Sequence, residues 1–223
     1  MEIKVKLFRV LLGGALLLAG CAASSMEDVQ QSGFLGDYSQ LPEGGNDQAA
    51  QVYFKPGVDF TQYDKLMFDR VVVLLSNTTE NRQVDAVMRK ELTDYYQNAL
   101  YAAFKDGYQI VYEPAPGVLR VRAAITDLKA SNPAVNTLST VIPVGIVVSG
   151  ATKAVSGDNL GTGEAASEID VLDALTGERL AAAVDRRQGG KGVFRGEWED
   201  AKEAIDFWAK RFRQRLDEMR RLK

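Results

Sequence analysis

The sequence predicts an α+β fold, in which a mixed, mainly antiparallel sheet carries two long helices on one face. Two observations lead to this prediction. Short strand-like segments follow one another through tight turns, and two long helical patterns stand apart from them, one before Gly107 and one at the C-terminus. Such segregation of hairpins and helices is typical of α+β sandwiches. The 223 residues, 46% hydrophobic and 26% charged, are sufficient for one core.

The N-terminus resembles the signal of a bacterial lipoprotein. Three positive residues precede an apolar run over residues 10–18, which is shorter than the roughly 20 residues that span a bilayer. Leu-Ala-Gly-Cys follows at 18–21, in the order of the lipobox. We therefore predict a signal peptide over residues 1–20, cleavage between Gly20 and Cys21, and diacylglyceryl and acyl groups such as palmitate on Cys21. The alternative is a plain secretory signal, or an N-terminal helix with an incidental cysteine.

Residues 21–51 are rich in Ser, Gly, Gln and Asp, which predicts a flexible tether behind the lipidated cysteine. Acyl chains on Cys21 would hold the protein on a membrane surface. Ala22 stands where an aspartate would resemble an inner-membrane retention signal, so we expect the periplasmic face of the outer membrane in a Gram-negative bacterium. Within the tether, Phe34, Leu35 and Tyr38 either dock as an apolar latch or share its disorder. Residues 52–223 are expected to form a single α+β domain.

The first core elements are a strand and a helix. Residues 63–75 contain a β-branched run typical of a strand buried on both faces. Asn77 and Glu80 have the spacing of a capping box, and apolar residues then recur at helical spacing up to Gly107. The helical face predicted from this spacing consists of Val84, Met88, Leu92, Tyr95, Ala99 and Ala102.

Paired strands follow. Residues 108–112 form a short strand, a Pro-Ala-Pro-Gly turn ends it, and residues 118–128 alternate between apolar and polar, which predicts a hairpin. A second pair is expected at residues 165–174 and 179–187, connected by Thr176 and Gly177. Residues 198–219 close the chain as an amphipathic helix, whose aromatic stripe is expected to face the sheet.

The segment at residues 137–155 has no clear assignment. It is apolar, but Pro143, Gly145 and Gly150 interrupt it, and it is too short and too broken for a membrane span. It is either a buried connection or a mobile apolar segment that meets lipid or a protein partner.

Four charged residues are the candidate partner surface. Arg120 and Arg122 alternate outward on one predicted strand, and Glu168 and Asp170 do so on another. If the two strands are neighbours, these side chains form a cross-strand charge ladder. That polar face is either simply solvated, which is the expectation for exposed ion pairs, or a recognition patch.

Composition excludes several kinds of chemistry. The chain has no histidine and one cysteine, so catalytic triads with histidine, zinc sites of Cys and His, and intrachain disulfides are excluded. No metal site, catalytic residue or cofactor is indicated. Without the first 20 residues, 24 positive and 29 negative side chains remain, and this acidic balance argues against nucleic acid as a partner.

Several segments resemble one bacterial lipoprotein family. They are SGFLGDYSQL at 32–41, KPGVDFTQYDKLMFDRV at 55–71, PAPGVLRVRAAITDL at 114–128 and DALTGERLAAAVDRR at 173–187. These segments are similar to the family called domain of unknown function 3313, and the resemblance covers nearly all of the chain after the signal. The family has no established activity, so the resemblance implies a periplasm-facing lipoprotein and no catalytic residues.

Three hypotheses for function follow. The first is a non-enzymatic envelope lipoprotein that binds or scaffolds an envelope protein or a peptidoglycan partner. The second is a hydrolase of envelope glycans that works with carboxylates, and the third is a carrier of a small ligand. A cleft with two close acidic residues would favour the second, an apolar pocket the third, and a filled core with a flat surface the first.

Overall fold

The computed structural model describes residues 31–76, 78, 81, 84–131, 162–189 and 196–221. The predicted cleavage and lipidation site at Gly20 and Cys21 lies outside these residues, as does the apolar segment at 137–155. No helix in the described part of the chain has the length and apolar character that crossing a membrane requires.

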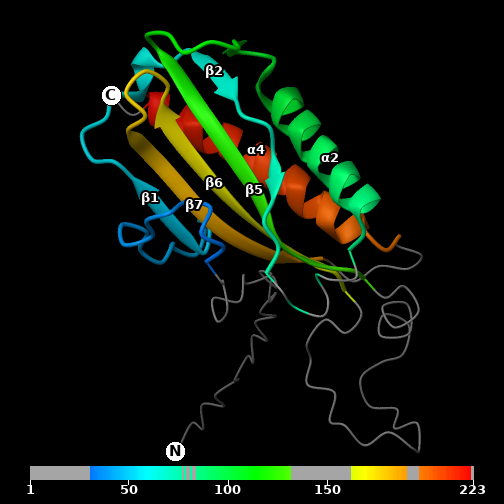
Figure 1. The fold of residues 1–223 in the computed structure, drawn as a ribbon. Helices are drawn as coiled ribbons and strands as arrows, with labels where there is room; N and C mark the ends of the chain where they lie inside the picture. Colours follow the sequence, from blue (N-terminus) through cyan, green and yellow to red (C-terminus); the bar gives the residue numbers. More distant parts are fainter. Residues whose placement is uncertain are drawn as a thin grey trace, which may run out of the picture.

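One mixed sheet forms the centre of the fold (Figure 1), with strands in the order β1-β7-β6-β5-β2-β4 and with β3 also paired to β5. The strands are β1 (Gln51–Phe54), β2 (Lys65–Phe68), β3 (Val72–Val73), β4 (Gln109–Ile110), β5 (Val118–Lys129), β6 (Glu164–Asp173) and β7 (Arg179–Gln188). The long strands β5, β6 and β7 pair antiparallel, as does β1 with β7, whereas β2, β3 and β4 pair in parallel. The predicted α+β class is confirmed.

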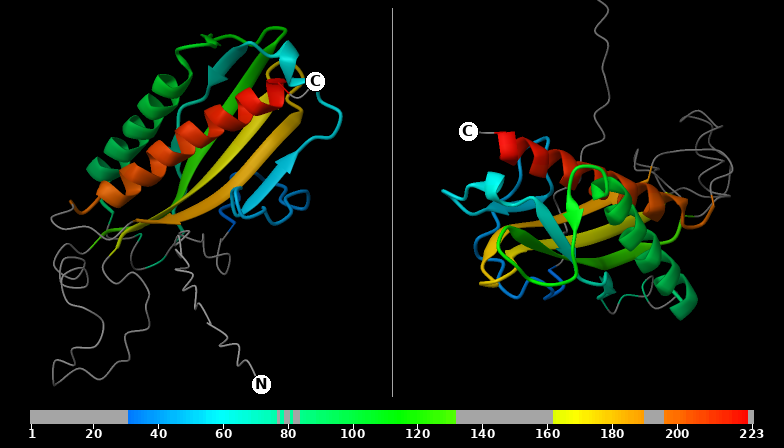
Figure 2. Two further views of the ribbon diagram at one scale, coloured as in Figure 1. Left: turned by 180° about the vertical axis from the view of Figure 1, so that it is seen from behind. Right: turned by 90° about the horizontal axis from the view of Figure 1, so that it is seen from above.

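Two long helices, α2 (Ala86–Phe104) and α4 (Glu199–Arg221), lie on the same face of this sheet (Figure 2). The C-terminal helix agrees with its prediction. The long helix α2 begins at Ala86, where the carboxylate of Asp85 accepts a hydrogen bond from the Met88 N–H at 2.8 Å. The predicted capping box at Asn77 and Glu80 lies outside the described residues.

The predicted face of α2 is confirmed in part, because Leu92 is buried and Met88, Tyr95 and Ala99 pack against the core, but the most buried stripe is a neighbouring one. It consists of Leu92, Tyr96, Leu100 and Phe104. Neighbouring apolar residues such as Tyr95 and Tyr96 satisfy two stripes of helical spacing, so periodicity alone did not identify the stripe that faces the sheet. Ala102, on the predicted face, is exposed.

The pairing of the early strands differs from its prediction. Residues 63–75 form two short strands, β2 and β3, that pair one after the other with β5. They are not buried on both faces, since Val72 is 39% exposed. The hairpin of residues 108–112 with 118–128 does not form either, because β2 lies between β4 and β5. Alternation in the sequence identifies a strand but not its neighbour. By contrast, the turn at Thr176 and Gly177 connects β6 to β7 as predicted.

The face of the sheet opposite the helices is covered by the chain just before β1. Leu35 and Leu41 are buried there against Ala182 and Val184 of β7, with Phe34, Tyr38 and Tyr53 packed around them. The latch alternative for Phe34, Leu35 and Tyr38 is therefore the one that the structure adopts. The prediction of a flexible tether over residues 21–51 is wrong for its described part, because apolar burial outweighed the polar composition. We name residues 32–41 the N-terminal segment.

Candidate functional site

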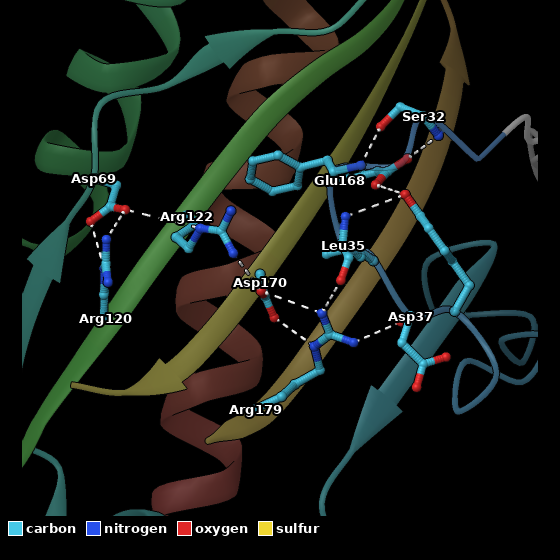
Figure 3. A network of polar contacts seen from close by, with 11 residues as sticks. Ser32, Leu35, Asp37, Asp69, Arg120, Arg122, Glu168, Asp170 and Arg179 are labelled. Carbon is cyan, nitrogen blue, oxygen red and sulfur yellow. Dashed lines mark hydrogen bonds and ion pairs between the residues drawn. The ribbon is translucent and has the colours of Figure 1, made fainter. Parts of the chain in front are cut away.

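The four residues of the predicted partner surface lie on adjacent strands, and one predicted pair forms. Arg122 stands directly opposite Asp170 in the register of β5 and β6, and its Nη1 lies 3.2 Å from Oδ2 of Asp170. Arg120 instead faces Asp69, in the link between β2 and β3, with contacts of 2.7 and 2.9 Å (Figure 3). The register places Arg120 opposite Leu172 and Glu168 opposite Ala124, so no second rung connects Arg120 to Glu168.

The two carboxylates of this face, Glu168 and Asp170, are not solvated, so the expectation of a solvated polar face is wrong for them. Glu168 is 0% exposed and Asp170 is 1% exposed, because the N-terminal segment lies over them. The Tyr38 hydroxyl donates to Glu168 at 2.6 Å, and the main-chain N–H of Ser32 donates to it at 2.9 Å. While the segment is in place, Glu168 and Asp170 have no surface to offer a partner.

Arg179 of β7 joins the segment to the sheet. Its Nε donates to Asp170 at 2.8 Å, and its two terminal nitrogens donate to the main-chain oxygens of Leu35 and Asp37 (Figure 3). A buried carboxylate is destabilising unless it is paired, and Arg179 both pairs with Asp170 and holds the segment that covers this carboxylate. Sequence reasoning did not single out Arg179.

A second feature lies on the helix face, where the described residues line an open, mostly apolar cavity of about 350 Å³ between α4, the strands β1, β6 and β7, and the loop at residues 46–49. Its strand side carries Val52, Phe54, Ile169, Val171, Ala181 and Ala183. Its helix side carries Phe207, Trp208, Phe212, Leu216 and Met219. Phe54 and Phe207 remain 38% and 36% exposed. Their exposure leaves apolar surface open to solvent in the cavity wall.

Small side chains on β7 leave the space that forms the cavity. The register places Val52 opposite Ala183 and Phe54 opposite Ala181, so these four residues share the face turned toward α4. An alanine fills little of the roughly 10 Å between packed layers, and two on the same face leave a hollow. The run of Ala181, Ala182 and Ala183 was the signal in the sequence that could have indicated this cavity.

Charged residues line one side of the cavity. Arg211 and Arg215 of α4 both pair with Asp47, and Nη2 of Arg215 lies 3.2 Å from the Asp47 carboxylate. The guanidinium carbon of Arg187 lies 3.5 Å from the centre of the Phe207 ring. The cavity thus combines an apolar body with arginine side chains, a combination suited to a ligand with an apolar part and an anionic part.

Asp185 is the buried carboxylate of the cavity. It accepts hydrogen bonds from Nε1 of Trp208 at 2.7 Å and from the main-chain N–H of Ala50 at 3.2 Å. Burial raises the pKa of Asp185, although these hydrogen bonds and the charge of Arg187 act in the opposite direction. Both carboxylates that line the cavity, Asp47 and Asp185, are therefore already engaged by neighbouring groups.

No group of three or more potential metal ligands occurs among the residues that the structure describes. The cavity does not include the residues of the predicted partner surface, which lie on the other face of the sheet.

Comparison with known proteins gives relatives without a described activity. The chain is 26% identical over 178 residues to "Uncharacterized lipoprotein YdcL" of Escherichia coli K12, and the match covers 79% of each protein. Among solved structures, the PelC dodecamer from Paraburkholderia phytofirmans is 11% identical with a TM-score of 0.40, over 72% of this chain and 95% of that one. Protein XCC0632 from Xanthomonas campestris is 10% identical with a TM-score of 0.41, over 74% and 93%.

Structural similarities at these TM-scores carry no inference about function. The family resemblance predicted from the sequence is confirmed, since the model of one family matches residues 30–212, most of the chain. The chain belongs to the family described as "Protein of unknown function (DUF3313)".

Proposed function

We propose that this protein is a lipid-anchored protein of the bacterial cell envelope, and that its folded part binds a small apolar ligand in the cavity beside α4. The anchor is supported by the lipobox at residues 18–21 and by the lipoprotein name of the relative that matches 79% of the chain. Diacylglyceryl and acyl groups on Cys21 would hold the protein on the periplasmic face of the outer membrane.

The observation that carries the binding role is the cavity itself. Ligand sites in proteins are typically concave, of about 300–1,000 Å³, and mostly apolar with a few polar groups, and this cavity of about 350 Å³ has those properties. Phe54 and Phe207 remain partly exposed in the wall of the hollow, and exposed apolar surface around a concave site is typical of a binding groove.

Hydrolysis is less well supported by the same site. A glycosidase pair needs a carboxylic acid and a carboxylate free to act across the cleft. Asp47 is held by two arginines and Asp185 by the Trp208 and Ala50 donors, so their chemistry is committed to the structure. We therefore propose a binding role without catalysis.

The test uses a soluble form that starts at Ala22, which keeps every described residue and carries no acyl group. Calorimetric titration with 1-decanol should show saturable binding with a stoichiometry near one. Ala183→Leu should abolish that binding, because the larger side chain occupies the cavity.

Ala102→Leu is the matched control, because Ala102 is exposed on α2 and is not among the residues that line the cavity. Both variants should keep the unfolding midpoint of the parent or exceed it. Decanol binding that Ala183→Leu leaves intact would overturn the cavity as the site, as would the absence of saturable binding of any ten-carbon chain. The anchor is tested separately, by labelling cells with palmitate and comparing the full chain with Cys21→Ala.

A further inference from the structure

We infer that the ligand of this cavity is a single-chain amphiphile of about ten carbons with one negative charge, and that Arg187 binds its carboxylate head. This inference rests on the proposed function, since it assigns the chemistry of the ligand for the same cavity. It draws on the size of the cavity, the charges that line it, and the surroundings of Arg187.

The volume limits the ligand to one chain. A carbon with its hydrogens takes on the order of 30 Å³, similar to the share of a water molecule in the liquid, so about 350 Å³ holds about a dozen non-hydrogen atoms. A ten-carbon fatty acid has that size. A lipid with two long chains is too large to be enclosed.

The charges that line the cavity favour an anion. Three arginines and two aspartates are among the lining residues, namely Arg187, Arg211, Arg215, Asp47 and Asp185. These side chains leave an excess of one positive charge when all are ionised. A ligand with one negative charge would balance it, and a cationic ligand would be repelled.

Arg187 is the arginine best placed to bind a head group. Arg211 and Arg215 are occupied by Asp47, whereas no carboxylate of the described residues lies within ion-pair distance of Arg187. Its guanidinium stacks on the ring of Phe207, which fixes its plane and leaves the edge with its N–H donors available. A carboxylate can accept two parallel hydrogen bonds from such an edge.

The experiment compares three probes with the same ten-carbon chain, which are decanoate, 1-decanol and decyltrimethylammonium. Decanoate and decyltrimethylammonium are titrated below their micelle concentrations, and 1-decanol below its solubility limit, into the soluble form that starts at Ala22. We expect decanoate to bind about tenfold more tightly than decanol, because a hydrogen bond to a charged group is worth about one factor of ten. The cationic probe should bind more weakly than decanol.

The variant Arg187→Met keeps the apolar stem and removes the charge. It should weaken decanoate binding about tenfold, so that decanoate no longer binds more tightly than decanol. Arg70→Met is the matched control, because the side chain of Arg70 is 76% exposed and lies outside the cavity, and it should change neither affinity.

The outcomes separate the two proposals. Equal binding of all three probes would overturn the inference and leave the proposed function standing, whereas binding of none would overturn both. Preference for decanoate that Arg187→Met does not reduce would refute the role of Arg187. If Arg187→Met does not fold, the comparison of probes on the parent protein still decides whether the site selects an anion.

Discussion

Replacing Arg179 by methionine tests whether charges bind the N-terminal segment to the sheet. The Arg179 side chain is 18% exposed, and its partner Asp170 is 2% exposed at the side chain. Removing one member of a buried ion pair costs about 3–5 kcal/mol, because the other charge stays buried. Since Arg122 still pairs with Asp170 at 3.2 Å, we expect a loss of unfolding free energy near the lower end, about 3 kcal/mol.

The assay is urea unfolding of the soluble form at pH 7, followed by tryptophan fluorescence and extrapolated linearly to water. The control is Arg70→Met, which removes an ion pair whose side chains are 76% and 42% exposed. Exposed pairs contribute about 0–1 kcal/mol, so this variant should stay within about 1 kcal/mol of the parent.

A second substitution identifies the cause of the loss. Asp170→Asn in the Arg179→Met background removes the buried charge, so the double variant should regain part of the lost free energy. A loss below about 1 kcal/mol for Arg179→Met, or no recovery in the double variant, would mean that the unpaired charge of Asp170 does not cause the destabilisation.

Two further predictions concern the N-terminal segment and Asp185. A chain that starts at Glu43 should have an unfolding free energy about 3 kcal/mol or more below that of a chain that starts at Gln31. The reason is that burial of Leu35 and Leu41 contributes about 1.5–3 kcal/mol each. Equal urea midpoints for the two chains would mean that residues 31–42 are a tether. The pKa of Asp185 is raised in the fold, so its contribution to stability should fall as pH rises from 3.8 through the raised pKa. The destabilisation by Asp185→Asn should therefore shrink over that range in urea unfolding, and a penalty that grows with pH would contradict the raised pKa.

Local patterns in the sequence were sufficient for much of the fold. Strands β5, β6 and β7 each have an alternation or a turn signal of their own, and α4 has a complete aromatic stripe, so each could be predicted within a few residues. The position of β2 between β4 and β5 depends on contacts between segments distant in the chain, which no local pattern records. The hairpin prediction failed for that reason.

The candidate site was less predictable than the fold. Arg122 and Asp170 could be paired from the alternation on their strands, but the burial of Glu168 and Asp170 depends on the N-terminal segment, whose polar composition resembles a tether. The cavity exists because the alanines of β7 meet an edge of α4 in space. The alanines of β7 and the apolar stripe of α4 can each be recognised in the sequence. That they face one another in the fold cannot.

Quenching of Trp208 by a brominated ligand tests most directly whether the cavity is occupied. The chain has two tryptophans, and Trp208 lines the cavity whereas Trp198 does not, so the variant Trp198→Phe carries a single reporter. We predict that 10-bromodecanoate quenches Trp208 emission saturably, that unlabelled decanoate reverses the quenching, and that Ala183→Leu prevents it. Saturable binding of the probe with Trp208 emission unchanged would place the ligand outside the cavity.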